Sequence, residues 1–300
     1  MTLLVMMLTL QGQVPTIQAP NPTLSVGREL RQDLPLDQKI QALQAAGRWA
    51  ELADLFETLE PKARGQRLGI WLEAMKKAQR WERLLAVLDA AIPQMEAKGA
   101  KALSERLLRV TALDRLGRKE DAFEAGLEVG LQGSSWCVIM AGNLAATVGR
   151  DDWLERAADS LIALYPKEAQ GWAWKGECLF RAGKYGAAEA PLEKAVELQP
   201  KLAGAWCNLG ACRNIRKAYP EAIQACDKAL ALDPLFLQAH FNRGLAHFGL
   251  QKYTEGREDM AKALATDPKD PETRARIEEN LKLADRYLAS RTRKGASGSK

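Results

Sequence analysis

The chain has few histidines and cysteines, which supply many metal ligands and catalytic groups. Its 300 residues include two histidines, His240 and His247, and five cysteines, an odd number that gives no complete disulfide framework. The sequence contains no C-x-x-C pair, Gly-rich phosphate loop, GxSxG or HExxH motif. A catalytic dyad would also need a placed nucleophile or carboxylate, and the sequence shows no such arrangement. We therefore expect a non-catalytic protein with no cofactor and no metal site.

The chain also lacks a large excess of charge of one sign. Lys and Arg number 43 against 38 Asp and Glu, which gives a formal net charge of +5, and the two signs are mixed along most of the sequence. Much of the surplus lies in the tail 291–300, which is rich in Gly and Ser and has no acid, so we predict disorder there. The remainder is close to neutral, which argues against a nucleic-acid partner.

No apolar run at the amino terminus reaches the roughly 20 residues that a membrane span requires, so we expect no stable membrane insertion. Residues 2–10, TLLVMMLTL, have the length of the apolar part of a secretory signal. However, no Lys or Arg precedes the run, and a cut after Ala19 would place Pro20 next to the scissile bond. We expect an exported, periplasmic protein if this segment is a signal peptide, and a cytoplasmic one otherwise.

What the sequence does contain is a repeat with a period of 34 residues, carried by segments 169–202, 203–236 and 237–270. Glycine, tyrosine, alanine and proline recur in matching columns of all three segments. The columns are Gly176, Gly210 and Gly244; Tyr185, Tyr219 and Tyr253; Ala195, Ala229 and Ala263; and Pro200, Pro234 and Pro268. Apolar residues at helical spacing in the second half of each segment predict an amphipathic helix. Pro191 lies well inside that helix and predicts a kink or a late helix start.

This pattern resembles the tetratricopeptide repeat, a family whose unit is a pair of antiparallel helices. Segment 203–236 keeps five residues of the family's signature, namely Trp206, Leu209, Gly210, Ala222 and Pro234. In the neighbouring segments Lys175 and Arg243 stand in the leucine column, and His240 stands in the tryptophan column. The resemblance implies an all-α fold, a right-handed α-solenoid of stacked antiparallel helix pairs.

Weaker copies extend the array upstream. Turn landmarks at Trp49, Trp81, Lys119 and Trp153 predict four degenerate hairpins, and segments 38–60, 66–92 and 101–130 each have the pattern helix, short turn, helix. After Pro271 a helix with a polar outer face has the pattern of the cap that stacked repeats need. The predicted division is 1–36, an apolar segment and linker; 37–134, degenerate repeats; 135–270, tetratricopeptide repeats; 271–290, capping helix; and 291–300, disordered basic tail.

The repeat also bears on the cysteines of segment 203–236. Cys207, Cys212 and Cys226 share their columns with residues that are nearly all apolar, so we interpret them as small buried hydrophobic residues. An adventitious disulfide and a metal site are the alternatives. The spacing of these cysteines does not match that of a tetrahedral zinc site.

In the tetratricopeptide family the first helix of each unit lines a concave groove that binds a peptide or helix. Carried over by column, the resemblance implies a groove formed by Trp174, Glu177, Phe180, Arg181, Asn208, Ala211, Asn214, Ile215, Phe241, Asn242, Leu245 and Phe248. Asn208 and Asn242 occupy a column in which the family often uses an amide to hold a peptide backbone. The columns of the family's carboxylate clamp hold mostly apolar residues here, so that clamp is not supported.

The aromatic residues of the groove predict a protein or peptide partner with an apolar anchor, and an adaptor or assembly scaffold. Packing of these aromatic rings against neighbouring helices is the alternative for each of them. The alternative function is a structural subunit that self-associates through its repeat ends.

Overall fold

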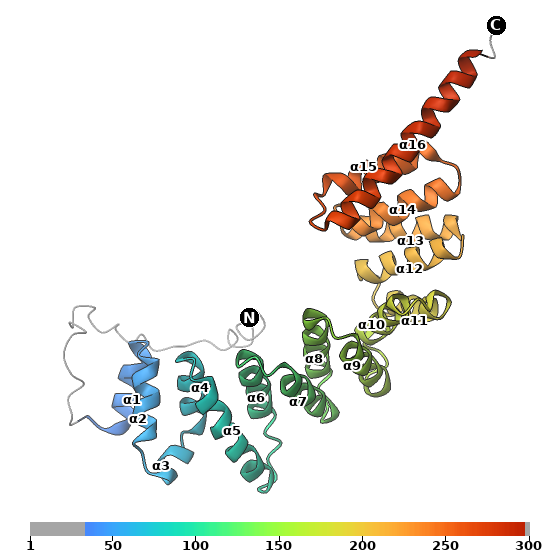
Figure 1. Cartoon of the computed structure of the whole chain (residues 1–300). Helices are drawn as coiled ribbons and strands as arrows, with labels where there is room; N and C mark the ends of the chain where they lie inside the picture. Colours follow the sequence, from blue (N-terminus) through green and yellow to red (C-terminus); the bar gives the residue numbers. More distant parts are fainter. Residues whose placement is uncertain (1–33, 298–300) are drawn as a thin grey trace, which may run out of the picture. The chain divides into compact units, whose positions relative to one another are not determined.

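The computed structural model describes residues 34–297, and this part of the chain consists of helices with no strand (Figure 1). The helices are α1 (Leu36–Ala45), α2 (Trp49–Glu57), α3 (Pro61–Gly65), α4 (Leu68–Lys77), α5 (Trp81–Glu96), α6 (Leu103–Arg115), α7 (Lys119–Leu131), α8 (Ser135–Val148), α9 (Asp151–Leu164), α10 (Ala169–Arg181), α11 (Tyr185–Leu198), α12 (Ala203–Ile215), α13 (Tyr219–Leu232), α14 (Leu237–Gly249), α15 (Tyr253–Ala265) and α16 (Pro271–Ser297). None of these helices is both long and apolar enough to cross a membrane.

The chain divides into two compact units, one ending at Gln79 and one beginning at Arg80. In the first unit α2 packs against α1 and α4 around Leu52, Phe56 and Met75, which are buried. In the second unit each helix from α5 to α16 contacts the next one along the chain. This order is that of a solenoid of stacked helix pairs, as the sequence predicted. The division between the units falls in the turn between α4 and α5. The sequence analysis had placed these two helices in one hairpin, segment 66–92.

The carboxy-terminal helix is longer than predicted. Helix α16 continues to Ser297, so the prediction of disorder is wrong for residues 291–297. The reason is that Arg, Lys and Ala are good helix formers and extend a helix that is already nucleated. Residues 298–300 lie outside the described part of the chain. Residues 1–33, which contain the possible signal peptide, also lie outside it.

The glycine column of the repeat sets the distance between the two helices of each hairpin. An ideal Cβ atom built on Gly176 would lie 2.5 Å from Leu192, one on Gly210 would lie 2.6 Å from the Cys226 sulfur, and one on Gly244 would lie 3.0 Å from the Met260 methyl group. Leu192, Cys226 and Met260 are themselves aligned across the repeat and fully buried. The glycines are therefore needed because any side chain would push the paired helices apart.

A second column links each hairpin to the proline that closes the one before it. The ring nitrogens of Trp172 and Trp206 each donate a hydrogen bond, at 2.9 Å, to the carbonyl oxygens of Pro166 and Pro200. His240 stands in the same column, and its Nε2 lies 2.9 Å from the carbonyl oxygen of Pro234. The replacement of tryptophan by histidine thus keeps the polar contact to the preceding turn.

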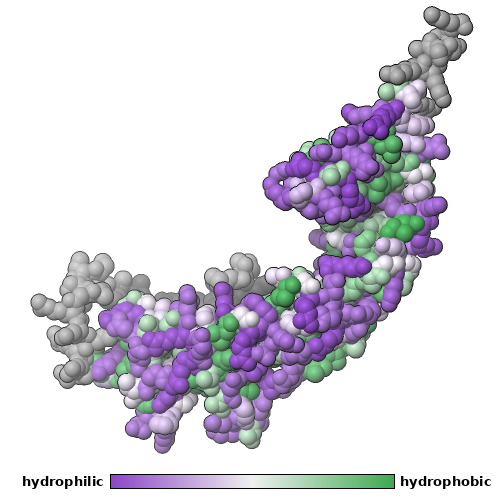
Figure 2. Space-filling model, viewed as in Figure 1, coloured by the Kyte–Doolittle hydropathy of each residue, from purple (hydrophilic) through white to green (hydrophobic). Residues whose placement is uncertain are grey.

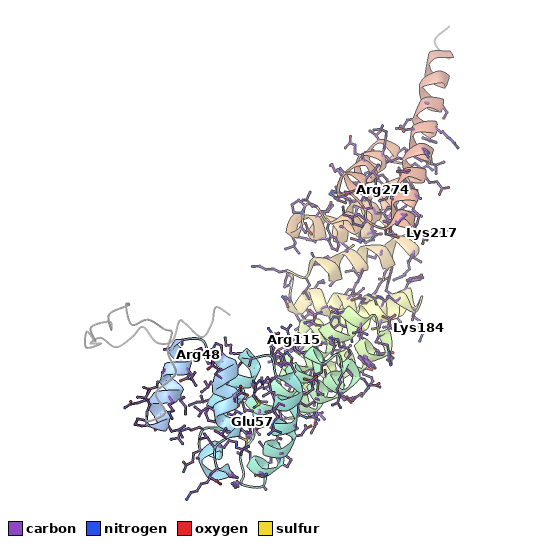
Figure 3. All side chains as sticks on the ribbon, turned by 60° about the vertical axis from the view of Figure 1, so that its left-hand side comes forward. Arg48, Glu57, Arg115, Lys184, Lys217 and Arg274 are labelled. Carbon is purple, nitrogen blue, oxygen red and sulfur yellow. The ribbon has the colours of Figure 1, made fainter. Side chains whose placement is uncertain are left out.

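The turns inside the hairpins explain why α11 starts where it does. Gly183, Lys217 and Gln251 occupy the same turn position and have positive φ angles of 73°, 64° and 61°. Figure 3 shows Lys184 and Lys217, from two successive turns, at the same edge of the second unit. Each turn leads into a helix that begins at the recurring tyrosine of the repeat, and α11 begins at Tyr185 with Pro191 inside it. The predicted late start is wrong because the turn, and not the proline, fixes the first residue of the helix.

Candidate partner-binding site

A pocket of about 250 Å³ opens where the first helices of the last three hairpins meet the capping helix. Helices α10, α12 and α14 supply most of its wall, and the first two turns of α16 supply the rest. The lining residues are Phe180, Cys207, Asn208, Ala211, Leu237, Gln238, Phe241, Asn242, Thr273 and Arg276. On the visible face of the second unit, hydrophobic patches are separated by hydrophilic side chains (Figure 2), so this face offers apolar surface in small areas.

Five of the predicted groove residues line this pocket: Phe180, Asn208, Ala211, Phe241 and Asn242. The two amides differ in their contacts. Asn242 Nδ2 lies 3.5 Å from the carbonyl oxygen of Cys207 and 3.4 Å from its sulfur, so this amide bridges α14 and α12. The Asn208 amide has no hydrogen-bond partner within the described part of the chain. Asn208 can therefore both donate to and accept from a bound backbone.

Trp174 is not available to a partner, and its assignment to the groove is a correction that the structure makes. Only 4% of the residue is exposed, and it belongs to the core of the fourth and fifth hairpins with Trp153 and Leu161. Its ring sits where Gly142 has no side chain, since a Cβ atom on that glycine would lie 2.2 Å from the ring. The indole fits against α8 because Gly142 has no side chain there. The position of Trp174 in the repeat could not show this contact, and so the sequence placed Trp174 in the groove.

The two charged residues predicted on α10, Glu177 and Arg181, form an ion pair with each other. Arg181 Nη2 donates to Glu177 at 2.5 Å, and Arg181 Nη1 donates to Asp151 at 2.6 Å. These ion pairs are largely exposed, so each contributes little to stability. Neither Arg181 nor Glu177 lines the pocket.

The remaining four predicted residues lie outside the pocket. Leu245 and Phe248 are half-buried against the cluster of Met260 and Ile277, so they belong to the packing of the last hairpin on α16. Phe241 packs on the same cluster but also lines the pocket. Asn214 Nδ2 donates to the carbonyl oxygen of Asn242 at 2.6 Å. Ile215 is 49% exposed at the end of α12.

Sequence reasoning missed the contribution of the capping helix. Thr273 and Arg276 line the pocket from α16, and the Arg276 guanidinium carbon lies 5.3 Å from the centre of the Phe241 ring. They precede the fully buried Ile277 by four residues and by one. The apolar Ile277 in an otherwise polar helix was the signal that could have identified them. On a helix, the residues four and one positions before a buried residue lie on or beside its buried face.

The cysteines of the repeat are buried and free, as the packing interpretation predicted. Burial raises the pKa of the Cys207 thiol to about 12 and, in Cys212, raises the pKa to about 11. The pKa of Cys226 is also raised by burial. A thiol needs deprotonation to act as a nucleophile or a metal ligand, so these three sulfurs are held in their inert form. Cys207 therefore contributes shape to the pocket wall.

The last hairpin contains a buried ion pair that compensates for an unusual residue. Arg243, which stands in the leucine column, donates from Nε and Nη2 to Asp259 at 2.9 and 2.6 Å. Asp259 is 3% exposed and lies between His240 and His247 at 3.5 and 3.6 Å. Burial lowers the pKa of His247 despite the nearby Asp259 carboxylate, whose charge Arg243 already balances.

The geometry defines the chain as a helical-repeat protein whose first helices and capping helix surround a small pocket. Family models for the tetratricopeptide repeat match residues 155–203, 203–236 and 237–270. Residues 155–270 of the chain are therefore tetratricopeptide repeats, and proteins of this family are generally non-catalytic modules for protein interaction.

Parts of the chain are similar to several solved structures. YrrB, described as a TPR protein with an unusual peptide-binding site, is 17% identical with a TM-score of 0.50, and the match covers 64% of this chain and 97% of YrrB. MamA is 22% identical with a TM-score of 0.45, and the match covers 52% of this chain and 92% of MamA. The first TPR of Spaghetti (RPAP3), solved with the HSP90 peptide SRMEEVD, is 27% identical with a TM-score of 0.38, with coverages of 41% and 94%. No curated protein matches the chain.

Proposed function

We propose that this protein binds a peptide or helix segment of a partner protein in the groove of α10, α12 and α14, and acts as a non-catalytic adaptor or assembly scaffold. The observation that carries the proposal is the pocket, which is lined by two aromatic rings and by an amide that has no hydrogen-bond partner among the described residues. Phe180 and Phe241 offer an apolar surface for an anchor side chain, and Asn208 can hold the backbone next to it.

The size of the pocket favours a side chain over a free small molecule. Sites for small ligands are usually about 300–1,000 Å³, whereas this pocket is about 250 Å³ and open to the groove. A single anchor residue fits such a volume, and the rest of the segment then lies along the first helices. Affinity at protein interfaces is commonly concentrated in a few anchors of this kind.

A selection of random peptides displayed on phage, with the immobilised full-length chain as bait, tests the proposal. Peptides that bind the wild type should lose affinity for Asn208→Ala and for Phe241→Ala. Leu235→Ala is the matched control, since Leu235 is 75% exposed and lies outside the pocket. Circular dichroism should show unchanged helicity for Asn208→Ala, whose side chain has no described partner. Equal binding to the wild type and both pocket variants would contradict the proposal.

Light scattering after size-exclusion chromatography tests the competing function. A monomer that binds selected peptides supports an adaptor. A stable homo-oligomer that Phe241→Ala and Asn208→Ala dissociate would show that a second copy fills the groove, and would favour the structural subunit instead.

A further inference from the structure

Arg276 has no acidic partner within the described part of the chain, unlike three other arginines of the last hairpin and the capping helix. Arg243, Arg257 and Arg274, in the same part of the second unit, each pair with an aspartate at 2.5–2.6 Å. Arg276 is exposed, and within the described part of the chain no carboxylate lies in ion-pairing distance of its guanidinium. It is also the one charged residue among those that line the pocket. Glu272 and Glu279 lie one turn away from Arg276 on α16, but neither is within ion-pairing distance, so the pocket carries one positive charge without a direct partner in the described part of the chain.

The position of Arg276 leaves its donors available. The guanidinium carbon lies 5.3 Å from the centre of the Phe241 ring, a cation–π contact that holds the side chain at the pocket. A guanidinium held by such a contact still presents N–H groups along its edges, and these match the two oxygens of a carboxylate. Phe241 thus both lines the pocket and contacts the guanidinium.

We propose that the pocket selects a partner segment in which an Asp or Glu side chain lies next to an apolar anchor side chain. The anchor enters between Phe180 and Phe241, and the carboxylate accepts hydrogen bonds from Arg276. This inference rests on the proposed function and names the chemistry of its ligand. It commits to a side-chain carboxylate within the segment. The cation comes from the capping helix, and the lining residues of α10, α12 and α14 supply no second cation to surround a chain end.

Peptides recovered from the phage selection provide the probes, synthesised with a fluorophore at one end and an amide at the other. Fluorescence anisotropy measures their binding to the full-length chain. Replacing the acid next to the anchor by its amide, Asp to Asn or Glu to Gln, should weaken binding about 10-fold, as expected for a charge-assisted hydrogen bond at a partly open site. The same loss should follow from Arg276→Gln with the acidic peptide, and the two changes together should weaken binding no further.

A charge reversal and a matched control complete the test. Arg276→Glu should prefer the peptide in which Lys replaces the acid. Arg286→Gln is the control, since Arg286 is exposed on the same helix outside the pocket and should bind every peptide as the wild type does. Peptides with a free carboxylate terminus should gain nothing over their amides.

The outcomes separate this inference from the function on which it rests. Selected peptides without acids would overturn the carboxylate preference while leaving groove binding intact. So would an acid-to-amide change that does not weaken binding to the wild type, or one that weakens binding to Arg276→Gln as much as binding to the wild type. Stronger binding of the free-acid termini would show that the pocket recognises a chain end. A selection that yields no peptide overturns both proposals.

Discussion

Replacing Arg243 by leucine should destabilise the last hairpin, because the substitution leaves the buried Asp259 carboxylate without its cation. Arg243 makes two charge-assisted hydrogen bonds to Asp259, whose side chain is only 4% exposed. Removing one partner of such a buried pair costs about 3–5 kcal/mol. The third hydrogen bond of Arg243, to Asp227, adds little because the Asp227 side chain is 52% exposed. For a chain of about this size, the melting temperature should fall by about 6–20 °C.

The preceding hairpin shows how the loss should be repaired. There the same two columns hold Leu209 and Ala225, and both are buried. The double variant Arg243→Leu/Asp259→Ala should therefore regain most of the lost stability, since it removes the uncompensated charge and restores an apolar pair. Exchanging a buried ion pair for hydrophobic residues is often neutral or stabilising.

Urea unfolding followed by circular dichroism measures the free energy of unfolding of the wild type, the two single variants and the double variant. Hydrogen exchange at α14 and α15 localises the change, because stacked repeats transmit stability mainly to their neighbours. Arg118→Ala is the control, since the pair of Arg118 and Asp121 is half exposed on both sides and its loss should cost less than about 1 kcal/mol.

A histidine beside Asp259 adds a further signature. His247 Nε2 lies 3.6 Å from this carboxylate, so protonation of His247 can partly replace the missing guanidinium in Arg243→Leu. The stability loss should then be smaller at about pH 5.5 than at about pH 8. The reasoning would be refuted if the double variant were no more stable than Arg243→Leu, because the uncompensated Asp259 charge would then not be the cause.

Three other predictions follow from the packing of the second unit. Gly210→Ala should cost about 1–3 kcal/mol in urea unfolding, since its methyl group would lie 2.6 Å from the Cys226 sulfur, whereas Gly204→Ala, with open space around it, should not destabilise the protein. Trp174→Ala should cost about 3–5 kcal/mol and leave peptide binding to correctly folded molecules unchanged, because the buried indole fills the core; loss of binding at full stability would contradict this. Burial lowers the pKa of His247 in the folded state, so the unfolded state binds more protons near pH 6.5 and stability should fall as the pH drops through this range. Thermal melts at several pH values should show a smaller dependence of the melting temperature on pH in His247→Phe.

The period of 34 residues was enough to predict the helix pairs, their order and the positions of their turns. Glycine at Gly176, Gly210 and Gly244 had to face a partner helix, and the proline column Pro200, Pro234 and Pro268 falls between helices, so these two columns predicted the hairpins before any contact was known. Burial of the cysteines followed from the same columns. These features are local or repeat at constant spacing, and a single sequence contains that information.

The tertiary structure alone decided which side chains reach the pocket. Trp174 turns into the core because Gly142, on a helix of the preceding degenerate hairpin, leaves room for it. Arg276 reaches Phe241 because the capping helix, which follows no repeat, packs in one particular rotation around Ile277. Each placement depends on contacts between segments that share no sequence pattern. The repeat therefore determined the scaffold, and packing between unlike helices determined the site.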